Sequence, residues 1–222
     1  NLLHGIGNTS YPLAYDVTSS DNTVTEIGHA DSNGTYGLAF FQDNHNNLVT
    51  LVSSACNNGS AGIVFLSSSN NNRIETITKI NDNGTDGIIF SSSKYNTVGI
   101  ITDASSNTAG AGVRFATGHQ CEIDTLTAAN SNGTYGVNFG TSFKCRIRKV
   151  GSTTGNATAS IFNDTGWNYV NNFAMAEATE VSGMVSFANS YLFSEKHDQG
   201  AYSKIITDGG MIESEASTLT NG

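Results

Sequence analysis

Two acidic residues share one position of a repeating sequence pattern, and this arrangement suggests glycan-cleaving chemistry. Glu75 and Asp124 lie two repeats apart, and Gly99 occupies the same position between them. If the repeats stack as parallel strands, the two carboxylates are about 9–10 Å apart. That separation is near the upper end for the acid and base of an inverting glycosidase. In the alternative interpretation, which the pattern favours, these acids form ion pairs on a solvated face.

Basic residues gather in one short segment and are candidates for binding an acidic glycan. Lys144, Arg146, Arg148 and Lys149 are four of the ten basic residues and lie within six positions. Arg146 and Arg148 are predicted to contact the glycan. The alternative is a solvated face on which Glu122 and Asp124 balance these charges.

Aromatic residues at turn or outward positions are further candidates, because an aromatic ring can stack on a sugar ring. Trp167 could equally be a subunit contact, since Trp is enriched at protein interfaces. The aromatic candidates for glycan binding are Tyr36, Tyr135, Trp167 and Tyr169.

The cysteines predict neither a disulfide framework nor a metal site. There are three, with no Cys-x-x-Cys pair and no calcium-binding Gly-Gly-x-Gly-x-Asp repeat, so the sequence predicts no metal and no cofactor. Cys121 and Cys145 replace Asn in consecutive repeats, which predicts two stacked, reduced thiols. The Asn-Gly-Thr/Ser triplets match the glycosylation sequon, but they recur at one tight turn and are interpreted as structural.

A repeat of roughly 25 residues sets these positions. One Phe column, two apolar columns and two Asn columns follow the same step. The Phe column is Phe40, Phe65, Phe90, Phe115 and Phe139. The apolar columns begin Val24, Val49, Ile74 and Ile27, Val52, Ile77. One Asn column runs Asn33, Asn58, Asn83, Asn107, Asn132 and Asn156; the other runs Asn22, Asn47, Asn72 and Asn96, then Cys121, Cys145 and Asn168.

These columns predict an all-β chain whose residues 1–173 form a right-handed, three-sided parallel β-helix of about seven coils. Apolar columns would fill the cylinder. Asn suits the turns because it tolerates the left-handed region and its amide can bond to neighbouring coils. The Gly columns fit positions that need a positive φ or lack room for Cβ. The columns stop near residue 174, and residues 174–222 carry 7 acids and 2 bases. They are predicted to be a cap or a second small β module.

Bulk composition excludes some partners. A formal charge of −9 argues against a nucleic-acid ligand. No apolar run approaches about 18 residues, so no membrane insertion is predicted. The first residues lack a signal-peptide pattern and an initiator Met, which suggests an excerpt of a longer protein.

The coils at 8–173 resemble the β-helix shafts of bacteriophage tailspikes and tail fibres, and also those of pectate lyases. The segments 194–202 (SEKHDQGAY) and 205–214 (IITDGGMIES) resemble a stretch that follows the β-helix in several phage tail proteins. The resemblance implies a homotrimer displayed on the virion, outside the cell, that binds bacterial surface polysaccharide alongside other tail proteins. Many such proteins cleave the glycan, but no motif here allows a catalytic residue to be transferred.

Three hypotheses follow from the sequence. The first is a virion tailspike or tail-fibre segment that recognises, and in a stronger form depolymerises, bacterial polysaccharide. The second is a free polysaccharide lyase or hydrolase on the same fold, with Glu75 and Asp124 as the catalytic acids. The third is a purely structural shaft or adhesin. Whether the chain is an enzyme stays open.

Overall fold

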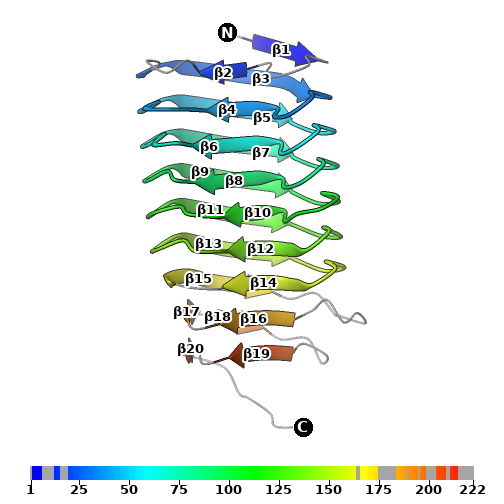
Figure 1. Cartoon of the computed structure of the whole chain (residues 1–222), viewed down its shortest axis with the longest axis vertical. Coiled ribbons are helices and arrows are strands. Elements are labelled where there is room, and N and C mark those ends of the chain that lie inside the picture. Colours follow the sequence, from blue (N-terminus) through cyan, green and yellow to red (C-terminus); the bar gives the residue numbers. More distant parts are fainter. Residues whose placement is uncertain are drawn as a thin grey trace.

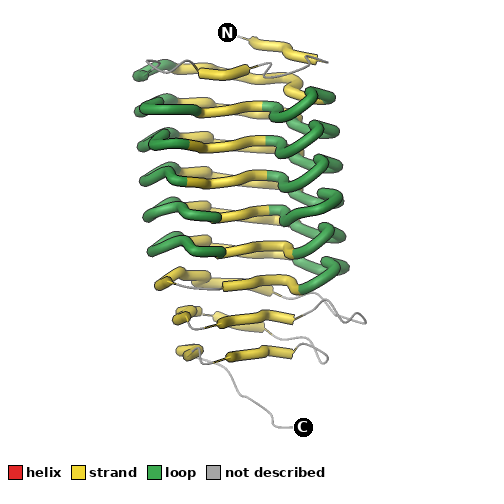
Figure 2. Tube along the Cα trace, in the orientation of Figure 1, coloured by secondary structure: helices red, strands yellow, loops and turns green. Residues whose placement is uncertain are grey.

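The chain forms an all-β parallel solenoid of about six turns. The computed structural model describes residues 2–6, 13–15, 20–163, 166–174, 184–188, 190–194, 196–198, 204–208 and 211–214, with side chains for 20–163 and 168–170. None of these residues is in a helix, and the coils stack along the long axis of the molecule (Figures 1 and 2). The predicted fold class is confirmed.

One strand from each coil joins an eleven-stranded sheet, here called sheet A. Its strands, in spatial order, are β1 (Leu2–Ile6), β3 (Thr23–Asp31), β5 (Leu48–Ser54), β7 (Arg73–Lys79), β9 (Thr97–Asp103), β11 (Glu122–Ala128), β13 (Arg146–Ser152), β15 (Gly166–Ala174), β17 (Ser190–Ser194) and β20 (Met211–Ser214), with β18 (Lys196–Asp198) also pairing with β15.

The second strand of each coil joins a nine-stranded sheet, sheet B. In chain order its strands are β2 (Leu13–Tyr15), β4 (Leu38–Phe40), β6 (Ile63–Leu66), β8 (Ile88–Ser91), β10 (Val113–Phe115), β12 (Tyr135–Phe139), β14 (Ala159–Asn163), β16 (Met184–Ala188) and β19 (Lys204–Asp208). The third side of each coil is a single bridge. These bridges join Ser20, His45, Asn70, Lys94, His119 and Phe143 in turn.

The predicted apolar columns fill the space between the sheets. The five Phe rings of sheet B form one continuous stack, with centroids 4.6–5.0 Å apart and planes within 10° of parallel. Phe90, in the middle of this stack, is fully buried. On sheet A, the columns that begin at Val24 and Ile27 face the same core. This continuous core holds the outward side chains of each strand in fixed register.

The Asn columns form hydrogen-bond ladders, as predicted. The Asn58 side-chain oxygen accepts from the Asn33 backbone N–H at 3.0 Å and from the Asn33 amide at 2.8 Å. The same pair of bonds links Asn58 to Asn83. The expectation that the Asn residues themselves adopt the left-handed region is wrong. The residue before each ladder Asn from Asn22 to Asn156 does so instead, for example Asn57 at φ 57° and Asp82 at φ 59°.

The Gly column at positions 62, 87 and 112 is explained by crowding. A Cβ on Gly87 would lie 2.5 Å from the Gly112 carbonyl oxygen of the next coil. Its φ is not in the positive range. Glycine is therefore required here because there is no room for a Cβ atom, and not because of a positive φ. Lack of room for Cβ was one of the two explanations predicted from the sequence.

The coil length changes near the C-terminus. Sheet pairing joins Ile161 to Val185, a step of 24 residues, and then Val185 to Ile205, a step of 20. Both sheets continue past residue 174, where the sequence columns stop. Assignment of residues 174–222 to a separate module stays a prediction.

Candidate functional site

A depression of about 270 Å³ opens where sheet A meets the bridged third side. Arg146 and Tyr169, both predicted glycan contacts, lie in it. Its lining residues are Tyr95, Gln120, Cys121, Glu122, Lys144, Arg146 and Tyr169.

Two neighbouring columns build this depression. Tyr95, Gln120 and Lys144 occupy equivalent positions in successive coils, each in the left-handed conformation at φ 52–56°. Each precedes a residue of the interrupted Asn column. Glu122, Arg146 and Tyr169 are paired in register on β11, β13 and β15. The coil backbone fixes the register of both columns, so the positions from which the aromatic, amide and charged side chains extend are set before any ligand binds.

The electrostatics of the depression are set by Arg148, which lies just outside its lining. The Arg148 guanidinium binds the carboxylate of Glu122 and, at 3.0 Å, that of Asp124. The bond to Glu122 is the main reason that the pKa of Arg148 is raised. Both acids therefore have a cationic partner outside the depression. The Lys144 ammonium lies 5.3 Å from the centroid of the Phe143 ring, a cation–π distance.

The predicted catalytic acids lie on the outer face of sheet A, outside this depression. Gly99 separates Glu75 from Asp124 in register. Their side chains are 45% and 46% exposed, and Glu75 lies 3.9 Å from Arg73 Nε. Both therefore form the ion pairs that the solvated-face interpretation expects. A catalytic role for them stays a prediction.

Two other predicted aromatic contacts, Tyr36 and Tyr135, do not line the depression. Tyr135 belongs to β12 of sheet B and stacks on Phe162 at 4.8 Å. Tyr36 lies just before β4 and packs against the apolar cluster of sheet B, with its ring 6.2 Å from that of Phe41. Trp167 lies on β15, but its side chain is outside the described side chains. The structure therefore divides the predicted glycan contacts between two faces.

Sequence reasoning missed Tyr95 and Gln120. A signal was present, because their column reads Asp21, Asn46 and Asn71 in the first coils and then changes to Tyr95, Gln120 and Lys144. The change begins at Tyr95, one coil before cysteine first takes the place of asparagine in the adjacent column.

Those cysteines have the predicted state. Cys121 and Cys145 are buried and free of disulfides. Cys121 contacts the carbonyl oxygens of Ser93 and His119 at 3.7 and 3.6 Å. Burial raises the pKa of the Cys145 thiol well above its ordinary value, so this thiol stays protonated.

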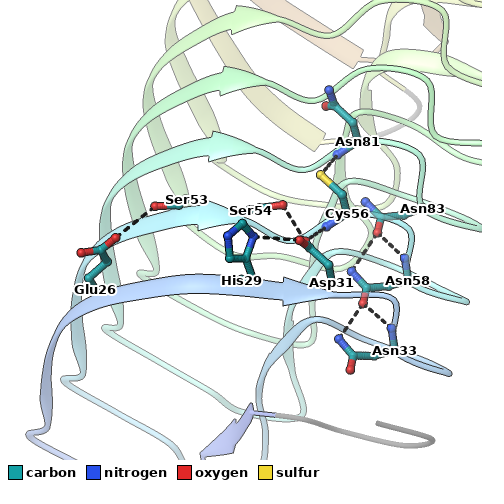
Figure 3. A network of polar contacts seen from close by, with 10 residues as sticks. All are labelled: Glu26, His29, Asp31, Asn33, Ser53, Ser54, Cys56, Asn58, Asn81 and Asn83. Carbon is teal, nitrogen blue, oxygen red and sulfur yellow. Dashed lines mark hydrogen bonds and ion pairs between the residues drawn. The ribbon is translucent and has the colours of Figure 1, made fainter. Parts of the chain in front are cut away.

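A polar network near the N-terminal end has residue types that suggest a catalytic triad (Figure 3). Asp31 accepts a hydrogen bond from the Ser54 hydroxyl at 2.6 Å, and His29 Nδ1 lies 3.1 Å from the other Asp31 oxygen. In a hydrolytic triad the imidazole lies between serine and carboxylate and takes the serine proton. Here the carboxylate lies between them, and it also accepts the Cys56 backbone N–H. The network therefore stabilises a turn and lacks the arrangement that activates a nucleophile.

Within the described ranges, no three His, Cys, Asp or Glu side chains group as metal ligands. The same residues include no helix long and apolar enough to cross a membrane. No protein-family model, curated protein or solved structure matches the chain.

Proposed function

We propose that this chain is a segment of a bacteriophage tailspike or tail fibre, and that it recognises bacterial surface polysaccharide through the depression at Tyr95. One observation carries the proposal: an exposed aromatic ring, an amide, and charged groups of both signs converge in a preformed hollow. A sugar has apolar ring faces and a rim of hydroxyls, so it needs this mixture of contacts. The solenoid fold by itself is equally compatible with a structural shaft.

The position of the depression suits an extended ligand. Tyr95, Gln120 and Lys144 belong to successive coils, so they follow one another along the solenoid axis at steps of about 4.8 Å. A polysaccharide lying along this axis would contact one residue of the column per coil. Tyr95 is 48% exposed and would offer its ring to the sugar at one end of the row.

We also propose that the chain acts as a homotrimer on the virion, next to other tail proteins. An apolar cluster on the outer side of sheet B supports self-association, because its rim is only partly buried and apolar surface often marks an interface. Ala39, Ala61 and Val64 form its buried centre, and Tyr36, Phe41, Leu66 and Ile89 pack around them. Light scattering should give three times the chain mass of 23.3 kDa. Ile89→Lys should reduce that mass, and a monomeric parent chain would contradict the trimer.

The test of recognition is an array of bacterial capsular and lipopolysaccharide glycans, followed by interferometry on each hit. Tyr95→Ala should weaken binding at least tenfold. Tyr135→Ala is the matched control, because it removes a tyrosine from sheet B. If Tyr135→Ala abolishes binding and Tyr95→Ala does not, the glycan binds sheet B and the assignment to the depression is wrong. Unfolding midpoints of both variants exclude loss of the fold.

The same incubations test the enzymatic alternative. Size-exclusion chromatography of each bound polysaccharide would show chain shortening. If shortening occurs, Glu75→Gln and Asp124→Asn should each abolish it, and full activity in both variants would remove these residues as the catalytic pair. Absence of binding to every glycan would support the structural-shaft hypothesis.

A further inference from the structure

We propose that Cys121 and Cys145 form a binding site for one copper(I) ion, held in a line between their two sulfur atoms. The two cysteines occupy equivalent positions in consecutive coils, because the residues that directly follow them, Glu122 and Arg146, are paired in register. They interrupt a column that otherwise carries asparagine. The site is chemically separate from glycan recognition and goes beyond the proposed function.

The two thiol side chains point in the same direction. Cys121 Sγ lies 3.6 Å from the carbonyl oxygen of His119, and Cys145 Sγ lies 3.9 Å from that of Phe143, the equivalent residue of the next coil. Each sulfur thus contacts the residue two positions earlier, which requires the same side-chain orientation in both coils. Equivalent atoms of stacked strands are one strand spacing apart, so the sulfurs are separated by about 4.8 Å. The Cys145 side chain is also the largest cause of the lowered pKa of Cys121, so the two groups interact.

This separation decides between a disulfide and a bridging ion. A disulfide has an S–S bond of about 2.05 Å and Cβ atoms about 3.5–4.5 Å apart, so two parallel cysteines would have to leave their positions in the core to form one. Two metal–thiolate bonds of about 2.3 Å in a line span about 4.6 Å, which is close to one coil step. The spacing of the coils therefore suits an ion between the sulfurs better than a bond between them.

The ligand set selects the ion. Thiolates are soft ligands that favour copper(I), and this ion is stable with two sulfur ligands in a line. Zinc and iron–sulfur sites use four protein ligands in their structural forms. Among the side chains that the structure describes, no three His, Cys, Asp or Glu residues group as metal ligands. A two-coordinate sulfur site therefore matches copper(I) and not zinc.

Binding exchanges two protons for one ion. Each thiol loses its proton as its sulfur bonds to copper, which stays in the +1 state, and the product carries one negative charge. The Ser93 hydroxyl lies 4.0 Å from Cys121 Sγ and can direct its proton to that sulfur. A Cβ at Gly118 would lie 3.4 Å from Cys145 Sγ, so the missing side chain leaves room beside the second sulfur. Both cysteines are buried, but Cys121 lines the depression, which gives the ion a path from solvent.

The experiment is an anaerobic titration of the whole chain with copper(I), in competition with bicinchoninate, a coloured copper(I) chelator. We expect a single bound ion per chain, a near-ultraviolet thiolate-to-copper absorption band, and release of about two protons per ion. Because the ion binds the folded chain, it should also raise the urea midpoint of unfolding. Failure of the chain to compete with the chelator, or binding with no such absorption band, would overturn the proposal.

Variants locate the site without disturbing the coil. Cys121→Asn and Cys145→Asn restore the residue type that the same column carries at Asn96 and Asn168, so both variants should keep the native circular dichroism spectrum. Each should lose the absorption band and at least a hundredfold of copper affinity. Cys56→Ser is the matched control, because Cys56 is also a buried free thiol but belongs to another column. If Cys56→Ser loses the band, or if the two Asn variants keep it, the assignment to this pair is wrong.

The disulfide alternative has its own readout. Oxidation of the metal-free chain with diamide, a thiol-specific oxidant, followed by a thiol count in denaturant should still find the three free cysteines. Loss of two thiols in the parent chain, but in neither Cys121→Asn nor Cys145→Asn, would show that the sulfurs approach more closely than one coil step. That outcome would overturn the linear site and leave the proposed glycan recognition untouched.

Discussion

Removal of one ladder amide should destabilise the solenoid strongly, and Asn83→Ala is the clearest case. The Asn83 side-chain oxygen accepts both the backbone N–H and the side-chain amide of Asn58, each at 3.0 Å. Its own amide donates to the Asn107 oxygen at 3.0 Å. Asn58 and Asn83 are 2% and 0% exposed, so water cannot replace the lost acceptor. Two orphaned donors at about 1–3 kcal/mol each give an expected loss of about 2–6 kcal/mol.

Urea unfolding followed by circular dichroism measures this loss. Because each coil contacts only its neighbours, unfolding can be local, and hydrogen exchange at the Asn58 amide supplies a second readout. Its protection should fall in Asn83→Ala. Asn138→Ala is the control, because the Asn138 side-chain oxygen is buried without a hydrogen-bond partner and its removal should be neutral or stabilising. A loss below about 1 kcal/mol in Asn83→Ala, with Asn58 still protected, would refute the idea that the ladder stabilises the coil.

Asn83→Asp adds a pH test of the same ladder. A protonated carboxyl can donate to the Asn107 side-chain oxygen as the amide does. An ionised carboxylate has no donor, so it would place an acceptor against that oxygen, and this repulsion raises the pKa of the new carboxyl in the folded chain. The variant should therefore match the parent chain below the unfolded value of about 3.9 and lose stability as the pH rises toward that raised pKa. Equal stability of the two chains at pH 3 and pH 7 would contradict this account.

Three other perturbations test the core, the turns and a buried acid. Phe90→Ala should cost about 3–5 kcal/mol in urea unfolding, because the ring is fully buried and stacked on both sides; a loss under about 1 kcal/mol would refute the role of the Phe stack. Gly87→Val should prevent native folding, since its Cβ would lie 2.5 Å from a carbonyl oxygen, and a native circular dichroism spectrum would contradict this. Burial raises the pKa of the Asp86 carboxyl in the folded chain. The ionised carboxylate therefore lowers the stability of the chain at pH values above that raised pKa, and this effect is absent below the pKa of the unfolded chain. Asp86→Asn should therefore stabilise the chain at pH 7 and lose that advantage at acidic pH; the Arg114 partner is half exposed and remains solvated.

The sequence alone determined the coil and its core. Phe40, Phe65 and Phe90 are separated by the length of one coil. Residues at this spacing lie directly above one another, so the identical side chains stack. The same argument placed the Asn ladders, the buried cysteine pair and the outward alignment of Glu75 with Asp124. In a solenoid, a difference in sequence position converts directly into a difference in height, so one-dimensional spacing predicts contacts between neighbouring coils.

Only the tertiary structure decided which side chains share a surface. Distance around the coil depends on where each turn bends, and the bends come from left-handed residues such as Asn57 and Tyr95, whose types show no constant pattern. The sequence therefore grouped Tyr36 and Tyr135 with Arg146, although Tyr135 is on sheet B, Tyr36 packs against sheet B, and Arg146 is on sheet A. The pairing of Arg148 with both Glu122 and Asp124 likewise depends on side-chain reach across strands. Stacking along the axis is encoded in the period, but convergence around the axis is fixed by the geometry of the turns.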